Sequence, residues 1–130
     1  MTLAKEDRNE LIKYRLLQAR ECIDEVDFQI ENRKFKTAIN RIYYGMFYSM
    51  TALSLKYNFQ SSKHLQLIGW FNKTFIKGNI ILPKYGKMLR DAFKNRTDGD
   101  YAPYIEFKKE NVLKLYSDMK AFINEVEKLL

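Results

Sequence analysis

Residues 38–57, "AINRIYYGMFYSMTALSLKY", decide how the rest of the chain can fold. Apolar and aromatic side chains recur in this stretch with the period of an α-helix, and they cover more than one face of it. The pattern predicts a helix over about residues 35–58. A helix that is apolar nearly all round lies either at the centre of a helix bundle or at an interface between subunits.

The same period indicates further helices on both sides of this stretch. An amphipathic stripe precedes it, and Pro83 is suited to the first position of a later helix. No segment alternates between apolar and polar residues as a half-buried strand does. We therefore predict an all-α, up-and-down bundle of about five helices that forms one domain over residues 1–130. The other expected helices span about residues 4–31, 63–77 and 83–95, with a last one from Val112 to the C-terminus.

Composition places limits on the class of protein. Cys22 is the only cysteine, which fits a reducing compartment. Residues 1–10 lack the apolar core of a signal peptide, and the most apolar window, residues 42–55, is shorter than a membrane span. The sequence therefore predicts a cytoplasmic protein. It contains no glycine-rich phosphate loop and no metal-ligand spacing, so we expect neither a cofactor nor a metal.

Positive charge is concentrated in the middle of the chain. Residues 32–96 contain 13 lysines and arginines and a single acid, Asp91, whereas acids outnumber bases in the segments before and after. A basic block with interspersed tyrosine and phenylalanine is typical of a surface that binds nucleic acid. The alternative is a solvated face whose charge is balanced by the two acidic segments.

Residues 96–104, "RTDGDYAPY", interrupt the periodic pattern before them. Two acids flank a glycine and two tyrosines flank the segment "AP". We expect a turn here, after the fourth helix. The residue types fit a catalytic loop, a binding loop or the end of a helix.

Three stretches together resemble the short bacterial and archaeal HEPN-domain proteins. They are residues 38–57, quoted above, "SKHLQLIGWFNKTFIKG" (62–78) and "LRDAFKNRTDGDY" (89–101). They follow the family's pattern of a "YYAMF"-like helix, a "TH"-initiated helix with a "FVK-G" end, and an "R…DY" turn. The resemblance covers most of the chain and rests on separated motifs that agree in order and spacing.

The resemblance implies an all-α bundle that forms a homodimer. Many HEPN proteins are metal-independent ribonucleases, often toxins paired with a small nucleotidyltransferase antitoxin. Their motif is an arginine followed after four to six residues by a histidine, and two copies meet across the dimer. Arg96 matches the arginine, but Tyr101 stands where the histidine is expected. Because tyrosine titrates near 10, it cannot replace histidine as a proton carrier at neutral pH, which puts ribonuclease activity of the family's type in doubt.

His64 is the only histidine and is therefore the candidate proton carrier. We predict a catalytic set of Arg96, His64 and Asp100, which meet at one end of the bundle if the third and fourth helices are antiparallel. Arg96 suits a phosphate because its guanidinium group offers a planar fork of donors. Each residue also has a structural alternative: His64 can bond a loop carbonyl or Asp100, and Arg96 can pair with Asp98 or Asp100.

Aromatic residues supply the remaining candidates. Tyr101 and Tyr104 can stack on a base together with a phosphate at Arg96, or they can pack the turn onto the bundle. We interpret the aromatic residues of the second helix as core or dimer interface rather than as a ligand cage; they are Tyr43, Tyr44, Phe47 and Tyr48.

Two functions follow from the sequence. The first is a HEPN-like protein that binds RNA or a nucleotide in a toxin–antitoxin or stress-defence system, with weak, altered or absent ribonuclease activity. The second is a non-catalytic interaction module that docks a partner such as a nucleotidyltransferase.

Overall fold

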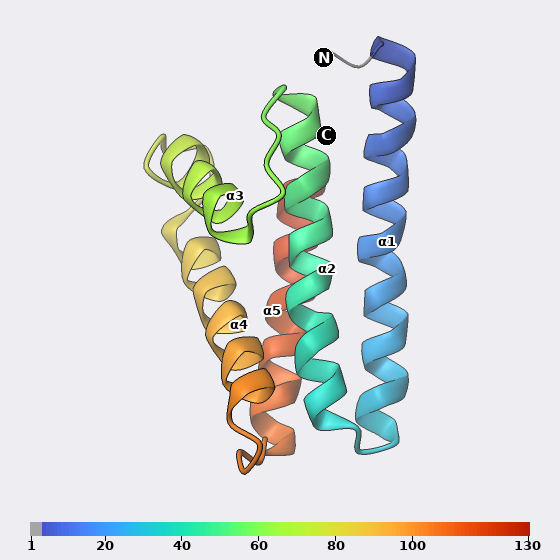
Figure 1. Ribbon diagram of the computed structural model, residues 1–130, viewed down its shortest axis with the longest axis vertical. Coiled ribbons are helices and arrows are strands. Elements are labelled where there is room, and N and C mark those ends of the chain that lie inside the picture. Colours follow the sequence, from blue (N-terminus) through green and yellow to red (C-terminus); the bar gives the residue numbers. More distant parts are fainter. Residues whose placement is uncertain (1–3) are drawn as a thin grey trace.

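A computed structural model describes residues 4–130, and every regular element in that range is a helix. The all-α prediction is therefore confirmed (Figure 1). The elements are α1 (Lys5–Glu31), α2 (Phe35–Lys56), α3 (His64–Phe71), the π-helical turn η1 (Asn72–Ile76), α4 (Pro83–Tyr101) and α5 (Lys109–Glu127). None of the helices described is long and apolar enough to cross a membrane.

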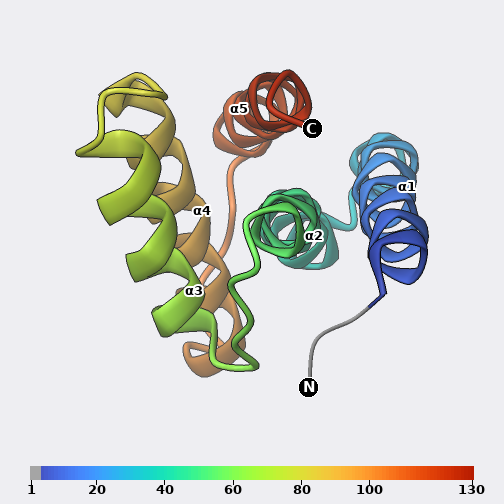
Figure 2. The same ribbon diagram turned by 90° about the horizontal axis from the view of Figure 1, so that it is seen from above.

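Helix α2 lies at the centre of the molecule. It contacts α1, α3, α4 and α5, and the view from above shows these helices arranged around it (Figure 2). Twelve of its 22 residues are buried. The apolar breadth of the stretch 38–57 is thus accounted for by a place at the bundle centre, so it is no longer an argument for a subunit interface.

Gly45 brings α2 close to α1 and α5. A methyl group on this glycine would lie 2.7 Å from Sδ of Met119 on α5 and 3.3 Å from Cβ of Cys22 on α1. Both neighbours are buried, Met119 completely and Cys22 to all but 1% of its surface. The small residue therefore allows three helices to pack together at one level of the core.

Helix α4 is longer than the sequence indicated. We expected it to end at about Asn95, with a turn from Arg96 onward, but it continues to Tyr101. Ion pairs four residues apart, Lys94–Asp98 and Arg96–Asp100, support the additional turns. The helix ends before Pro103, which disfavours helical backbone in the residue that precedes it.

Gly99 lies inside this added part of α4 rather than ending the helix. The glycine is buried, and a methyl group on it would lie 3.2 Å from Cζ of Phe107. The absence of a side chain therefore allows the loop between α4 and α5 to pack directly on the helix.

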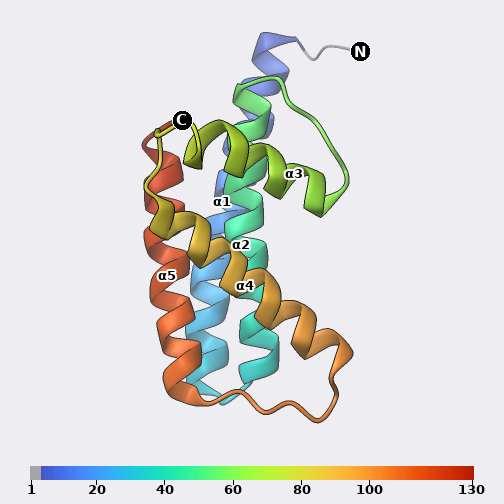
Figure 3. The ribbon, with the colours of Figure 1, turned by 90° about the vertical axis from the view of Figure 1, so that its left-hand side faces the viewer.

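Helix α3 departs from the up-and-down arrangement. It crosses the bundle obliquely, and α4 then descends from near its far end (Figure 3). The expected helix over residues 63–77 exists, but its second half, Asn72–Ile76, is π-helical. Because of the oblique direction, the start of α3 lies beside the middle of α2.

Candidate functional site

Two consecutive tyrosines on α2 form the base of the candidate site. Tyr43 is fully buried, whereas Tyr44 is partly exposed. Their rings meet edge to face with centroids 5.3 Å apart. Tyr43 faces the start of α3, and Tyr44 faces α4, as their hydrogen bonds show.

His64, the first residue of α3, is held by three aromatic side chains. Its Nδ1 lies 2.8 Å from the hydroxyl oxygen of Tyr43. Its ring stacks on Phe47 with centroids 4.1 Å apart, and it meets the ring of Tyr44 edge to face with centroids 5.8 Å apart. Burial lowers the pKa of His64, and the positive charge of Arg96 lowers it further. The imidazole is therefore neutral at pH 7.

The hydroxyl of Tyr43 determines which nitrogen of His64 carries the hydrogen. Burial raises the pKa of Tyr43, so the hydroxyl stays protonated. In the described part of the chain its only hydrogen-bond partner is Nδ1 of His64. Because a buried hydroxyl that donates to nothing is costly, we assign Tyr43 as the donor and Nδ1 as the acceptor. The hydrogen of the neutral imidazole then lies on Nε2.

Arg96 reaches the same two tyrosines from α4. Its Nη2 donates a hydrogen bond of 3.3 Å to the hydroxyl of Tyr44. Its guanidinium carbon lies 5.6 Å from the ring centroid of Tyr43 and 5.5 Å from that of Tyr44. The side chain retains 24% of its exposure, so solvent can reach part of it.

Asp100 is the carboxylate partner of Arg96. Its Oδ2 lies 3.0 Å from Nε of Arg96, one helical turn away, but the buried N–H does not point at it well enough to form a hydrogen bond. The contact is therefore an ion pair that leaves donors of the guanidinium free. Asp100 is placed to orient Arg96, and within residues 4–130 it forms no hydrogen bond or ion pair with His64.

The predicted site residues fall into two groups. His64, Arg96 and Asp100 gather around Tyr43 and Tyr44, although they do so beside the middle of α2 and not at one end of the bundle. The oblique direction of α3 causes this difference. Tyr101 and Tyr104 lie outside the group, with 81% and 95% of their surfaces exposed.

The sequence interpretation missed the part that Tyr43 and Tyr44 play. We assigned both to the core or a dimer interface, and Tyr43 is indeed buried. Each hydroxyl, however, bonds a residue of the candidate site. Adjacent tyrosines on an otherwise apolar helix were the available signal, because buried tyrosine hydroxyls need a partner.

Among residues 4–130, no group of three or more His, Cys, Asp and Glu side chains comes together in a way that could hold a metal ion. The candidate site instead offers donors: the guanidinium of Arg96 and, by the assignment above, Nε2–H of His64. An arrangement of this kind suits an anion such as a phosphate.

Comparison with known proteins identifies the family. The HEPN domain matches residues 12–129, and the chain belongs to this family. A UPF0332 protein of Thermotoga maritima is 34% identical over 124 residues, which is 95% of this chain and 94% of that protein. The toxin candidate MJ0142 of Methanocaldococcus jannaschii is 36% identical over 72% of this chain and 63% of its own length. A second toxin candidate of that organism, MJ0605, is 27% identical over 98% of this chain and 95% of its own length.

Proposed function

We propose that this HEPN protein binds RNA, that Arg96 and His64 hold a phosphate of the RNA, and that cleavage of the bound strand is weak or absent. The observation that carries the proposal is the meeting of Arg96 and His64 on the rings and hydroxyls of Tyr43 and Tyr44. Arginine is the side chain best suited to phosphate because it donates two parallel hydrogen bonds.

The charge of the chain supports a polyanionic ligand. Arg96, His64 and the two tyrosines lie within residues 32–96, where bases outnumber acids by 13 to one. Such a surface attracts RNA through many weak contacts, each of which releases counterions from the phosphates. The partial burial of Arg96 strengthens its own contact, because a charged hydrogen bond is stronger where water is excluded.

The proton on Nε2 of His64 explains why we expect little cleavage. Attack by a 2′-hydroxyl on the neighbouring phosphate needs a base that accepts the hydroxyl proton. The neutral imidazole described above has its lone pair on Nδ1, where the hydroxyl of Tyr43 occupies it. His64 is therefore a hydrogen-bond donor towards RNA. Tyr101, which stands at the expected histidine position, is exposed and lies outside the group around Tyr43 and Tyr44.

The similarity to toxin candidates supports a place in a toxin–antitoxin system. We propose that the chain acts there as a homodimer with a nucleotidyltransferase as its antitoxin, which is the arrangement that the HEPN resemblance implies. Light scattering of the purified protein tests the dimer, and a monomer mass at micromolar concentration would contradict it.

Binding of a labelled oligoribonucleotide, followed by fluorescence anisotropy, tests the site. Arg96→Ala removes a charged hydrogen-bond donor that is worth about 1.5–3 kcal/mol, so we expect affinity to fall by about tenfold or more. Arg96→Lys keeps the charge but loses the planar fork, and it should recover only part of the affinity. Arg90→Ala is the matched control, because Arg90 is an exposed arginine of the same helix that has no contact with the two tyrosines.

Incubation with RNA, followed by electrophoresis of the products, tests the second half of the proposal. We expect the wild-type protein to leave most of the RNA intact. Rapid cleavage by the wild type would contradict the second half of the proposal, and its disappearance in His64→Ala would show that the cleavage depends on His64. Equal RNA affinity of Arg96→Ala and Arg90→Ala would overturn the phosphate site.

A further inference from the structure

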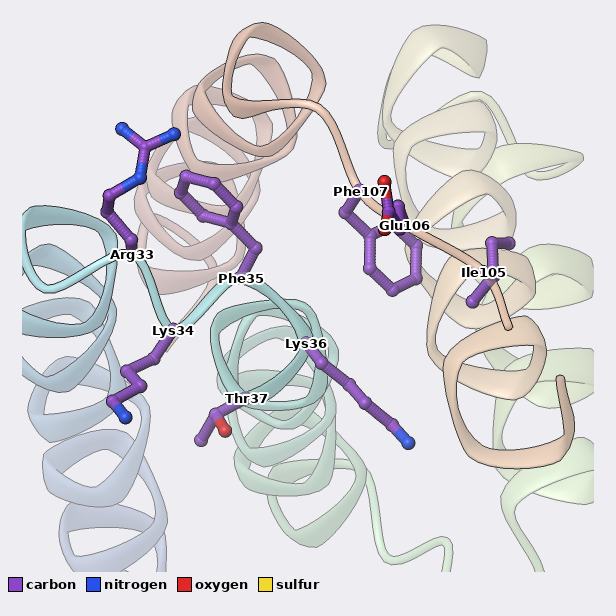
Figure 4. A pocket seen from close by; sticks show the side chains of 8 residues that line it. All are labelled: Arg33, Lys34, Phe35, Lys36, Thr37, Ile105, Glu106 and Phe107. Atoms are coloured by element: carbon purple, nitrogen blue, oxygen red, sulfur yellow. The ribbon is translucent and has the colours of Figure 1, made fainter. Parts of the chain in front are cut away.

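A second basic feature lies outside the site around Tyr43 and Tyr44. It is a cleft of about 480 Å³ between the α1–α2 turn and the α4–α5 loop (Figure 4). Arg33, Lys34 and Lys36 line it on the side of α2, and Phe107 lines it on the side of the loop. We call it the Arg33 cleft.

The cations of the Arg33 cleft lack acidic partners. Arg33, Lys34 and Lys36 are all exposed, and none forms an ion pair within residues 4–130. Glu106 is the only acid in the lining. Elsewhere in residues 4–130, each lysine that forms an ion pair does so with an acid three or four residues away, for example Lys94 with Asp98. Uncompensated positive charge around a cleft complements a ligand with several negative charges.

The Arg33 cleft offers flat apolar surface as well as charge. The guanidinium carbon of Arg33 lies 5.4 Å from the ring centroid of Phe35, and Figure 4 shows this arginine beside that ring. The adjoining loop carries Tyr104, which is 95% exposed. A positively charged groove with accessible aromatic rings is the arrangement by which proteins bind single-stranded nucleic acid, because bases stack on the rings while phosphates contact the cations.

The last turn of α4 joins the Arg33 cleft to the site of Arg96. A Cβ on Gly99 would lie 3.2 Å from Cζ of Phe107, which lines the cleft, and 3.9 Å from Cγ of Lys36. The next residue, Asp100, pairs with Arg96. Gly99 and Asp100 are three and four residues from Arg96 and share one side of α4 with it, so the two features lie next to each other.

Helix α2 also connects the Arg33 cleft to the site of Arg96. Lys36 and Tyr44 are eight residues apart, which corresponds to about 12 Å along the helix axis and keeps the two side chains on neighbouring faces. Lys36 lines the cleft, and Tyr44 bonds Arg96. A ligand bound at both places must be long enough to extend over about this distance, which a single nucleotide phosphate is not.

We propose that the Arg33 cleft is a second subsite for single-stranded RNA, which holds the backbone of a segment continuous with the phosphate at Arg96. The proposal rests on the proposed function, because the Arg96 site supplies the other point of attachment. It assigns Lys34 and Lys36 to phosphate contacts and Tyr104 to stacking on a base. The RNA is recognised by its charge and its unpaired bases and not by a particular sequence.

The test compares two ligands and two matched double variants by fluorescence anisotropy. The ligands are a labelled uridine mononucleotide and a labelled oligouridylate that is long enough to reach both subsites. The cleft variant is Lys34→Ala/Lys36→Ala. The control is Lys13→Ala/Lys128→Ala, which removes the same charge from lysines that are 77% and 72% exposed and are remote from the cleft. Circular dichroism checks that both variants keep the helical fold.

We expect the cleft variant to bind oligouridylate about tenfold more weakly than the control, with mononucleotide affinity unchanged. The slope of log affinity against log salt should become shallower by about 0.7 for each RNA phosphate that the variant no longer neutralises. Tyr104→Ala should weaken oligouridylate binding several-fold but leave binding of a duplex RNA unchanged, because paired bases are not available for stacking.

The possible failures are distinguishable. If the cleft variant and the control bind oligouridylate with the same affinity and slope while Arg96→Ala weakens it, the second subsite is wrong and the proposed function stands. If Arg96→Ala binds both ligands as the wild type does, the proposed function is wrong and the inference falls with it. Equal weakening of mononucleotide and oligouridylate binding in the cleft variant would also overturn the second subsite.

Discussion

Helix α2 presents two faces that differ in kind. Towards α1 and α5 it is closely packed, and Gly45 faces the buried side chains of Met119 and Cys22. Towards α3 and α4 it offers the hydroxyls of Tyr43 and Tyr44, each bonded to a polar side chain of another helix. The change takes place within three consecutive residues, because successive side chains of a helix point in directions about 100° apart.

One helix thus contributes both to the packing of the core and to the candidate binding site. The packed face leaves little room for added volume, and its stability comes from close contact. On the other face the polar groups are fixed by one another, and Arg96 and His64 keep donors available for a ligand. Substitutions on the first face should therefore change the free energy of unfolding, whereas those on the second should chiefly change protonation and binding.

The largest expected effect is on the packed face. Gly45→Val would place methyl groups against Met119 and Cys22, and overpacking of this kind costs about 1–3 kcal/mol of stability. The control is Gly69→Val, because nothing lies within 4 Å of the position where a Cβ of Gly69 would be. Urea unfolding measures both. Equal destabilisation of the two variants would show that the loss comes from placing valine in a helix and not from close packing at Gly45.

Tyr43→Phe removes the hydroxyl that bonds His64 on the face towards α3, and we expect it to lower the free energy of unfolding by about 1 kcal/mol. It should also raise the pKa of His64, since the variant lacks the hydrogen bond that favours the neutral imidazole. NMR titration of the single histidine measures that change. Tyr57→Phe is the control, because the hydroxyl of Tyr57 forms no hydrogen bond within residues 4–130. An unchanged pKa would contradict the assignment of Tyr43 as the donor.

Tyr44→Phe should have a smaller effect on stability, about 0.5 kcal/mol, because its hydrogen bond to Arg96 is long at 3.3 Å and partly exposed. Its effect on RNA affinity should be clearer, since Arg96 is then without one of the groups that fix its position. Binding assays at low salt compare it with Tyr43→Phe. If Tyr44→Phe lost more stability than Tyr43→Phe, the result would contradict the order expected from the full burial of Tyr43 and the partial exposure of Tyr44.

The smallest effect concerns pH. The pKa of His64 is lowered in the folded protein from 6.5, so below pH 6.5 the unfolded chain binds a proton more readily than the folded chain. Stability should therefore fall as the pH decreases from 6.5 towards the lowered pKa, and it should be independent of His64 above that window. The difference in urea midpoint between the wild type and His64→Gln, followed across this range, isolates the histidine. A wild type that gains stability on acidification relative to His64→Gln would contradict the direction of the shift.

Much of the fold could be predicted because the spacing of apolar residues indicates which face of each helix is buried. The bounds of α1 and α2 follow from their stripes, and Pro83 is the first residue of α4 as expected. The extent of α4 could not be predicted in the same way. Gly99 suggests the end of a helix in a sequence, but here it is a point of contact with Phe107, a residue of the following loop.

The candidate site was predictable only in part. Arg96, His64 and Asp100 were recognisable by their chemistry and by the HEPN resemblance. Their position beside the middle of α2 depends on the oblique direction of α3, which no local sequence pattern indicates. The Arg33 cleft was likewise hidden, because it is formed by two loops about 70 residues apart that only the closed bundle brings together.

The reactivity of Cys22 can be used to measure how often the packed face opens. Its thiol is 1% exposed, and burial raises its pKa to about 11, so the reactive thiolate is scarce in the native state. A thiol reagent can therefore modify it only when α1 separates from α2 and α5. Because it is the chain's single cysteine, the rate of labelling reports how often these three helices part, without the introduction of any probe.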